Sequence, residues 1–155
     1  MKKRITIIAL ALIITISIAV SFALKFSSSK EGVLTPAKGV ITIPTKDVSD
    51  GKAHFFNVKS DNGTNVTFFT LKSSDGIIRA AIDACDVCYK SGKGYVQDGD
   101  FMVCTNCGRK FASNRINEVK GGCNPAPLNR KIVDDNLVIS MADINENSWY
   151  CEYKK

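Results

Sequence analysis

Two Cys-x-x-Cys pairs carry most of the chemistry that this sequence can perform. The first is Cys85-Asp86-Val87-Cys88, and the second, after a further fifteen residues, is Cys104-Thr105-Asn106-Cys107. Each pair can wrap a short turn around a metal ion, and the hairpin between the pairs can bring the two turns face to face. The spacing therefore predicts a metal site with four thiolate ligands, namely Cys85, Cys88, Cys104 and Cys107.

A fifth cysteine lies close behind the second pair. Cys123 follows Gly121-Gly122 and precedes Asn124-Pro125. A closed tetrahedral zinc site needs only four ligands, whereas small residues around a cysteine are compatible with iron–sulfur ligation. Two cofactors therefore remain open: an iron–sulfur cluster with Cys123 among its ligands, or a structural Zn²⁺. In the zinc alternative, Cys123 is a buried thiol or a disulfide partner of Cys151.

His54 is the one histidine of the chain. The two-residue period of a strand would place it on the same face as Phe56 and Val58. It is a candidate additional metal ligand, although a hydrogen-bonded core imidazole is the simpler interpretation. We expect Trp149 and Tyr150 to be core residues.

The charge of the chain gives little support for nucleic-acid binding. There are 21 basic and 15 acidic residues, and three of the basic ones are Lys2, Lys3 and Arg4. The remainder of the chain therefore has 18 positive and 15 negative groups, a balance of +3, with no basic run interleaved with aromatic residues. We expect no nucleic-acid partner.

The N-terminus reads as a membrane segment. An uncharged and almost wholly apolar stretch runs from Ile5 to Leu24, and as a helix it would span roughly 30 Å. We predict a transmembrane helix over residues 1–24, with its basic end in the cytoplasm and all later residues in the periplasm or cell exterior. The alternative is a cleaved signal peptide with Ser21-Phe22-Ala23 as the cleavage site, but signal cores are usually shorter.

The rest of the chain reads as a stalk over residues 25–38 and a Cys-rich β domain over 39–155. Gly-containing turns at Asn62-Gly63 and Asp75-Gly76 separate β-branched and aromatic runs, which predicts an antiparallel meander. One helical turn is expected within 113–120. The predicted fold is mainly β: a small antiparallel domain with a zinc-ribbon or rubredoxin-like metal site, preceded by one N-terminal helix. Strands are expected at 39–43, 52–59, 65–71, 77–82, 94–97, 101–104, 130–133 and 137–141.

Several motifs occur together between about Gly51 and Leu128. They are Asp83-Ala84-Cys85-Asp86-Val87-Cys88, Lys93-Gly94-Tyr95, Cys104-Thr105-Asn106-Cys107-Gly108 and Gly121-Gly122-Cys123-Asn124-Pro125-Ala126-Pro127-Leu128. In combination they resemble the signature of the FtrD-like family of membrane iron–sulfur-containing proteins.

The resemblance implies a membrane-held, ferredoxin-like protein that passes electrons. It implies association with bacterial iron-uptake permeases and periplasmic copper proteins, so the partners would be a membrane redox protein or permease and an extracytoplasmic metalloprotein. It also implies that the metal ligands come from Cys85, Cys88, Cys104, Cys107 and Cys123. Cys151 lies outside the pattern.

Three functions therefore remain after the sequence analysis. The first is extracytoplasmic electron transfer by an iron–sulfur centre, linked to uptake of iron or another metal. The second is a structural zinc-ribbon interaction module. The third is a thiol redox or copper-handling protein, which is disfavoured because a redox-active Cys-x-x-Cys pair usually begins a helix, whereas Cys85 follows a predicted strand. The sequence has no phosphate-binding loop and no recognisable general base, so we expect no enzymatic activity of its own.

Overall fold

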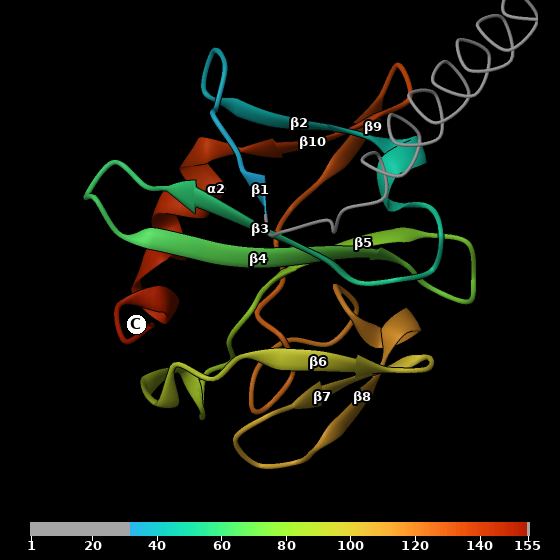
Figure 1. The fold of residues 1–155 in the computed structure, drawn as a ribbon, viewed down its shortest axis with the longest axis vertical. Coiled ribbons are helices and arrows are strands. Elements are labelled where there is room, and N and C mark those ends of the chain that lie inside the picture. The colour runs from blue at the N-terminus through green and yellow to red at the C-terminus, as the bar shows by residue number, and fades with distance from the viewer. Residues whose placement is uncertain (1–31, 155) are drawn as a thin grey trace, which may run out of the picture. The chain divides into compact units, whose positions relative to one another are not determined.

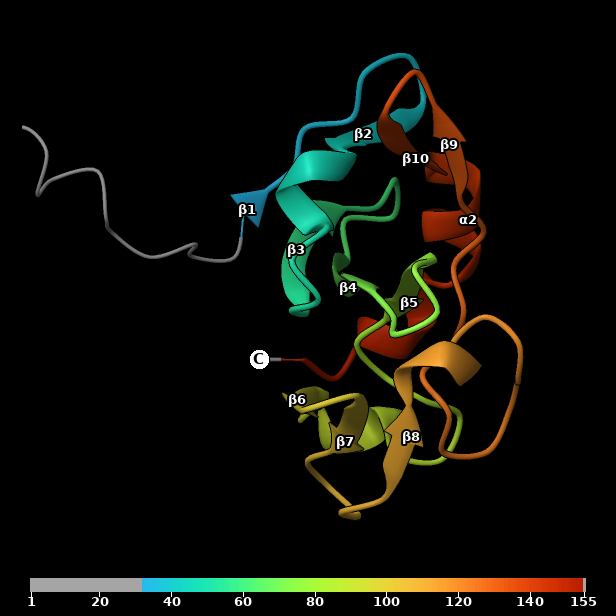
Figure 2. The ribbon, with the colours of Figure 1, turned by 90° about the vertical axis from the view of Figure 1, so that its right-hand side faces the viewer.

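Three small β-sheets are stacked on one another in the computed structural model, which describes residues 32–154 (Figures 1 and 2). The middle sheet has the order β1-β3-β4-β5, with β1 Gly32–Val33, β3 His54–Lys59, β4 Asn65–Lys72 and β5 Ile78–Ile82. On one side lies the sheet of β2 Val40–Pro44, β10 Asn136–Ser140 and β9 Lys131–Val133. On the other side lies the sheet of β6 Tyr95–Asp98, β7 Phe101–Cys104 and β8 Lys110–Ala112.

The helices of the described residues are short. The α-helix is α2 Met141–Glu146, and the 3₁₀ turns are η1 Thr45–Val48, η2 Tyr89–Ser91, η3 Ser113–Arg115 and η4 Ser148–Cys151. The domain is thus mainly β, as the sequence predicts.

The predicted meander is confirmed. β3 pairs antiparallel with β4, and β4 pairs antiparallel with β5. Gly63 and Gly76 occupy the two turns with φ of 88° and 82°, a left-handed conformation that glycine adopts without steric cost. The predicted hairpin is also present, because β6 pairs antiparallel with β7.

The structure differs from the predicted elements in several places, among them an additional strand, β8. Gly32 and Val33, within the predicted stalk, pair in parallel with β3. Met141, predicted to end a strand, instead begins α2, because the Ser140 hydroxyl accepts a hydrogen bond from the Ala142 backbone N–H and caps the helix. Of the helical turn predicted within 113–120, only η3 is helical.

β4 is buried on both faces, and each face belongs to a different core. Phe68 packs in the core shared with β2, β10 and α2, whereas its neighbour Phe69 packs in the core shared with the β6-β7-β8 sheet. This second core includes Cys85 and Cys104. The core between β4 and the β2-β10-β9 sheet therefore stabilises the domain. The cysteines meet in the other core, between β4 and the β6-β7-β8 sheet.

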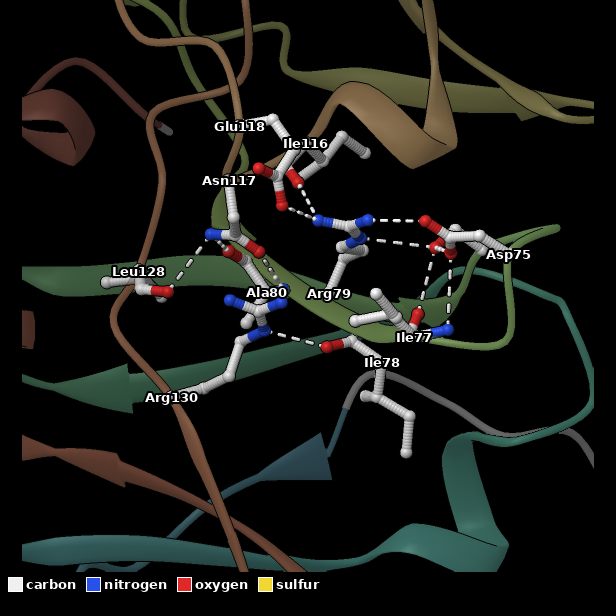
Figure 3. A network of polar contacts seen from close by, with 11 residues as sticks. Asp75, Ile77, Ile78, Arg79, Ala80, Ile116, Asn117, Glu118, Leu128 and Arg130 are labelled. Atoms are coloured by element: carbon white, nitrogen blue, oxygen red, sulfur yellow. Dashed lines mark hydrogen bonds and ion pairs between the residues drawn. The ribbon is translucent and has the colours of Figure 1, made fainter.

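The outer edge of β5 is covered by the chain that follows Cys123. The backbone of Ala126 bonds to Ile82 and Ala84, and the Leu128 N–H donates to the Ala80 carbonyl. Asn117, at φ 69°, adds side-chain hydrogen bonds to both backbone groups of Ala80 (Figure 3). These bonds satisfy an otherwise open strand edge and bring Cys123 back toward Cys85.

The side chain of Arg79 joins β5 to the segment that leads to Cys123. The guanidinium is 2% exposed, donates to the Ile116 carbonyl, and forms ion pairs with Asp75 and Glu118 (Figure 3). The hydroxyl of Ser73 accepts a further hydrogen bond from it. The buried guanidinium is therefore paired with carboxylates and hydrogen-bonded to two further acceptors, as the burial of its charge requires.

The predicted transmembrane helix and its cleavage site lie outside the described residues, and so does most of the predicted stalk. Between residues 32 and 154, the structure contains no helix that is long and apolar enough to cross a membrane.

Candidate metal centre

Five cysteine sulfurs gather at the end of β5 in two overlapping groups. The Sγ atoms of Cys85, Cys88 and Cys104 lie within 4.8 Å of one another, and so do those of Cys88, Cys107 and Cys123. Cys88 belongs to both groups. The structure thus brings together all five cysteines that the sequence singles out as candidate ligands.

The first pair is positioned by β5 and by a tight turn. β5 ends at Ile82, three residues before Cys85. The Tyr89 N–H donates to the Cys85 carbonyl, and the Cys88 N–H lies 3.3 Å from the Cys85 sulfur as a hydrogen-bond donor. The turn therefore points both sulfurs to one side.

The second pair is positioned by the hairpin of β6 and β7. Cys104 is the last residue of β7, and its carbonyl accepts a hydrogen bond from the Gly108 N–H at 2.8 Å. Between the two cysteines of the pair, the side-chain amide of Asn106 donates to the Cys88 sulfur at 3.4 Å. The two Cys-x-x-Cys turns are therefore directly connected by a hydrogen bond to sulfur.

Burial divides the centre into an inner and an outer side. Cys85 and Cys104 are buried, Cys88 and Cys123 are partly buried, and Cys107 is exposed. Burial raises the pKa of the Cys104 thiol to about 11 and also raises the pKa of Cys123. The backbone N–H of Arg109 lowers the pKa of Cys107. The Cys104 thiol would be protonated at neutral pH without a cation, so a bound metal is what would make it a thiolate.

The donor set fits the cofactors proposed from the sequence. Thiolates are the ligands of both iron–sulfur clusters and structural zinc. Cys85 and Cys88 also receive N–H donors at their sulfurs, and such hydrogen bonds tune the potentials of iron–sulfur clusters. The ligands of an iron–sulfur cluster would come from Cys85, Cys88, Cys104, Cys107 and Cys123. A Zn²⁺ ion would be held by the two Cys-x-x-Cys pairs, without Cys123.

Two other candidates from the sequence do not join the cysteines. The His54 imidazole lies 2.7 Å from a carboxylate oxygen of Asp50, and His54 belongs to neither thiol group found in the described chain. Cys151 is a free thiol in the opposite core and lies 3.8 Å from the Thr67 carbonyl, so the alternative of a Cys123–Cys151 disulfide is wrong for this structure.

Trp149 is the clearest departure from the predicted core. It is 40% exposed and packs edge-on against Tyr89, with ring centroids 5.0 Å apart. Tyr150 is buried as predicted and donates a hydrogen bond to the Asp86 carboxylate, between the two cysteines of the first pair.

The sequence assigned no role to Asp83 or Tyr95, which both support the centre. The Asp83 carboxylate accepts a hydrogen bond from the Tyr95 N–H at 2.7 Å and forms an ion pair with Lys154. Burial, followed by the neighbouring Cys85 sulfur, raises the pKa of the Tyr95 phenol far above its usual range. The spacing of Asp83 and Tyr95 from the cysteines gives no local signal for these contacts, because the partners of Asp83 lie 12 and 71 residues away in the chain.

Gly94 is required by this arrangement, and its substitution gives a first prediction. A Cβ at Gly94 would lie 2.2 Å from an Asp83 carboxylate oxygen, and Gly94 has φ 69°. We expect Gly94→Ala to lower the free energy of unfolding by about 3 kcal/mol, because overlap adds to the backbone strain. Urea unfolding and the metal content of the purified protein would measure the effect.

Gly99 provides the matched control. It also has positive φ, at 58°, but a Cβ there would meet no atom of the described chain within 4 Å. Gly99→Ala should therefore show the strain alone, about 1 kcal/mol, with normal metal content. Equal losses of stability in the two variants would contradict the importance of the contact with Asp83.

Comparison with known proteins gives a family for the chain. A family model matches residues 48–150, a range that includes all five clustered cysteines and the strands from β3 to β10. No protein with a curated description and no solved structure matches the chain significantly. The family match confirms the resemblance that the motifs show. The chain belongs to the FtrD-like family, which is described as membrane iron–sulfur containing protein.

Proposed function

We propose that this protein transfers electrons at the outer side of a membrane through an iron–sulfur centre held by Cys85, Cys88, Cys104, Cys107 and Cys123. The observation that supports it most directly is the convergence of these five sulfurs in two groups that share Cys88. Iron–sulfur clusters are bound by cysteine thiolates. The family description names the same kind of centre.

The unequal burial of the ligands suits electron exchange. Cys85 and Cys104 face the second core, so the inner side of the centre is shielded from water. Cys107 is exposed and Cys123 is partly buried, so a partner can approach the outer side closely. A centre with one accessible side can exchange electrons while the protein protects the rest of it.

We infer the location from the N-terminal sequence and the partners from the resemblance to the family. The basic residues Lys2, Lys3 and Arg4 before an apolar stretch favour an N-terminal anchor with the domain outside the cytoplasm. Electrons would come from a membrane redox protein or permease and go to an extracytoplasmic metalloprotein, or the reverse. A link to iron or other metal uptake rests on the family alone.

A structural zinc ribbon is the second candidate. It is favoured by the approach of the Cys-x-x-Cys turn after β5 to the Cys-x-x-Cys turn at the end of β7, an arrangement that a single Zn²⁺ can stabilise. In that case four thiols bind the zinc and the fifth is not needed.

The test is an anaerobic absorption spectrum with metal analysis of the full chain, purified in detergent. Iron, acid-labile sulfide and broad visible absorption that bleaches with dithionite are expected. A colourless protein with one zinc per chain would replace the proposal with the zinc ribbon.

Protease added to intact spheroplasts should digest the domain, and resistance that disappears only after lysis would contradict the extracytoplasmic location.

A further inference from the structure

Tyr95 contacts the centre from its buried side. It is the first residue of β6, it lies opposite Cys104 in the β6–β7 register, and its side chain is buried. Its hydroxyl donates a hydrogen bond to the Cys123 carbonyl at 2.7 Å. The ring is held by Phe69 and Phe111, with centroids 6.3 Å away in each case.

The backbone of Tyr95 connects it to the segment that carries Cys85 and Cys88. Its N–H donates to Asp83, which lies two residues before Cys85. Tyr95 also lines, with Cys85, Cys88 and Cys104, a space of about 10 Å³ behind the sulfurs, which is at the lower limit for one water molecule. The phenol thus packs against the inner sulfurs and leaves almost no room for solvent there.

Cys123 depends on a side-chain hydrogen bond such as that of Tyr95 more than Cys85 and Cys104 do. Cys85 follows β5 and Cys104 ends β7, whereas Cys123 lies in a loop after Gly121 and Gly122, which have φ of 87° and 63°. Glycine backbones restrict the chain least. The next regular bonds to the rest of the domain begin at Ala126.

We propose that Tyr95 is a positioning residue for Cys123: its hydroxyl holds the Cys123 carbonyl and thereby keeps the Cys123 sulfur beside Cys88 and Cys107. The identity of the cofactor rests on the proposed function, but the tether acts in the metal-free protein too. Tyr95→Phe tests it directly, because the substitution removes the hydroxyl and keeps the buried ring.

The first readout uses the metal-free full chain in detergent, under anaerobic conditions. Limited alkylation with iodoacetamide, followed by peptide mass spectrometry, gives the rate at each cysteine. In Tyr95→Phe we expect the rate at Cys123 to rise about five- to tenfold, the size expected for loss of one buried hydrogen bond. The rates at Cys85 and Cys104 should stay within error of the wild type.

The second readout is metal retention in the protein as purified. If Cys123 is a ligand of the bound metal, release of that metal to a chelator should be faster in Tyr95→Phe by a similar factor. If the cofactor is an iron–sulfur cluster, the electron paramagnetic resonance spectrum of the reduced protein should also change, since the geometry at one ligand changes.

Tyr150→Phe is the matched control. It removes a hydroxyl that bonds to Asp86, next to the first pair, and it leaves the bond to Cys123 in place. Unchanged alkylation at Cys123 and unchanged metal release in Tyr95→Phe would overturn the inference, and so would an equal rise at every cysteine. Absence of iron and sulfide from the wild type would reject the proposed function only, because the alkylation result does not depend on the cofactor.

Discussion

Replacement of Cys88 by serine is expected to abolish the metal centre. Cys88 is the one thiol that belongs to both groups, so its loss leaves two sulfurs on the inner side and two on the outer side. We expect metal affinity to fall by more than the roughly 10- to 100-fold that loss of a supporting residue around a metal ligand costs. Metal analysis and visible absorption of the anaerobically purified variant would measure it.

Substitutions at the other ligands should be less severe. Cys107→Ser and Cys123→Ser each remove a thiol from the outer group and leave Cys85, Cys88 and Cys104 intact. We expect these two variants to retain a centre that is altered in its spectrum or more labile. Normal metal content and a normal spectrum in Cys123→Ser would show that Cys123 is not a ligand.

Two variants control for nonspecific damage. Cys151→Ser changes a thiol that lies in the opposite core, and His54→Gln changes an imidazole that bonds to Asp50. Both should keep the metal content of the wild type. Loss of metal from His54→Gln would instead support the role of His54 as an additional ligand, and normal metal content in Cys88→Ser would reject the assignment of the centre.

Arg79→Met is expected to cause a large loss of stability at a site away from the cysteines. The substitution keeps the apolar stem but leaves the Ile116 carbonyl without its buried donor, and it breaks the ion pairs with Asp75 and Glu118. Removal of one partner from a buried network usually costs about 3–5 kcal/mol. Asp75 and Glu118 are 36% and 57% exposed, so water compensates them in part and we expect about 2–3 kcal/mol.

Urea unfolding of Arg79→Met and of the wild type would measure this difference in the free energy of unfolding. Because Arg79 also fixes the segment that leads to Cys123, the variant should release metal faster than the wild type. Lys110→Met is the control: its ion pair with Asp98 joins two side chains that are 56% and 62% exposed, and such exposed pairs contribute little to stability. Equal stability of Arg79→Met and the wild type would show that the buried network contributes nothing net.

Much of the fold could be predicted because the relevant signals are local. Turns at Gly63, Gly76 and Gly99 separate short runs of β-forming residues, and the structure has a hairpin at each of them. The start of α2 at Met141 was not predicted, because the apolar run that forms β10 extends to Met141 with the alternation expected of a strand. The Ser140 cap decides the boundary there.

The sequence by itself determined the types of the candidate ligands and their pairing into two turns, because a Cys-x-x-Cys turn needs only four consecutive residues to place two sulfurs together. Only the tertiary structure decided which other residues join them. Cys123 joins because the segment up to Leu128 bonds along the edge of β5, and Cys151 is excluded because it packs on the opposite face of β4. Tyr95 gains its role through contacts with Asp83 and Cys123, which are 12 and 28 residues away. Such contacts depend on how three sheets stack to bury their apolar faces, a property of the whole domain that no local spacing encodes.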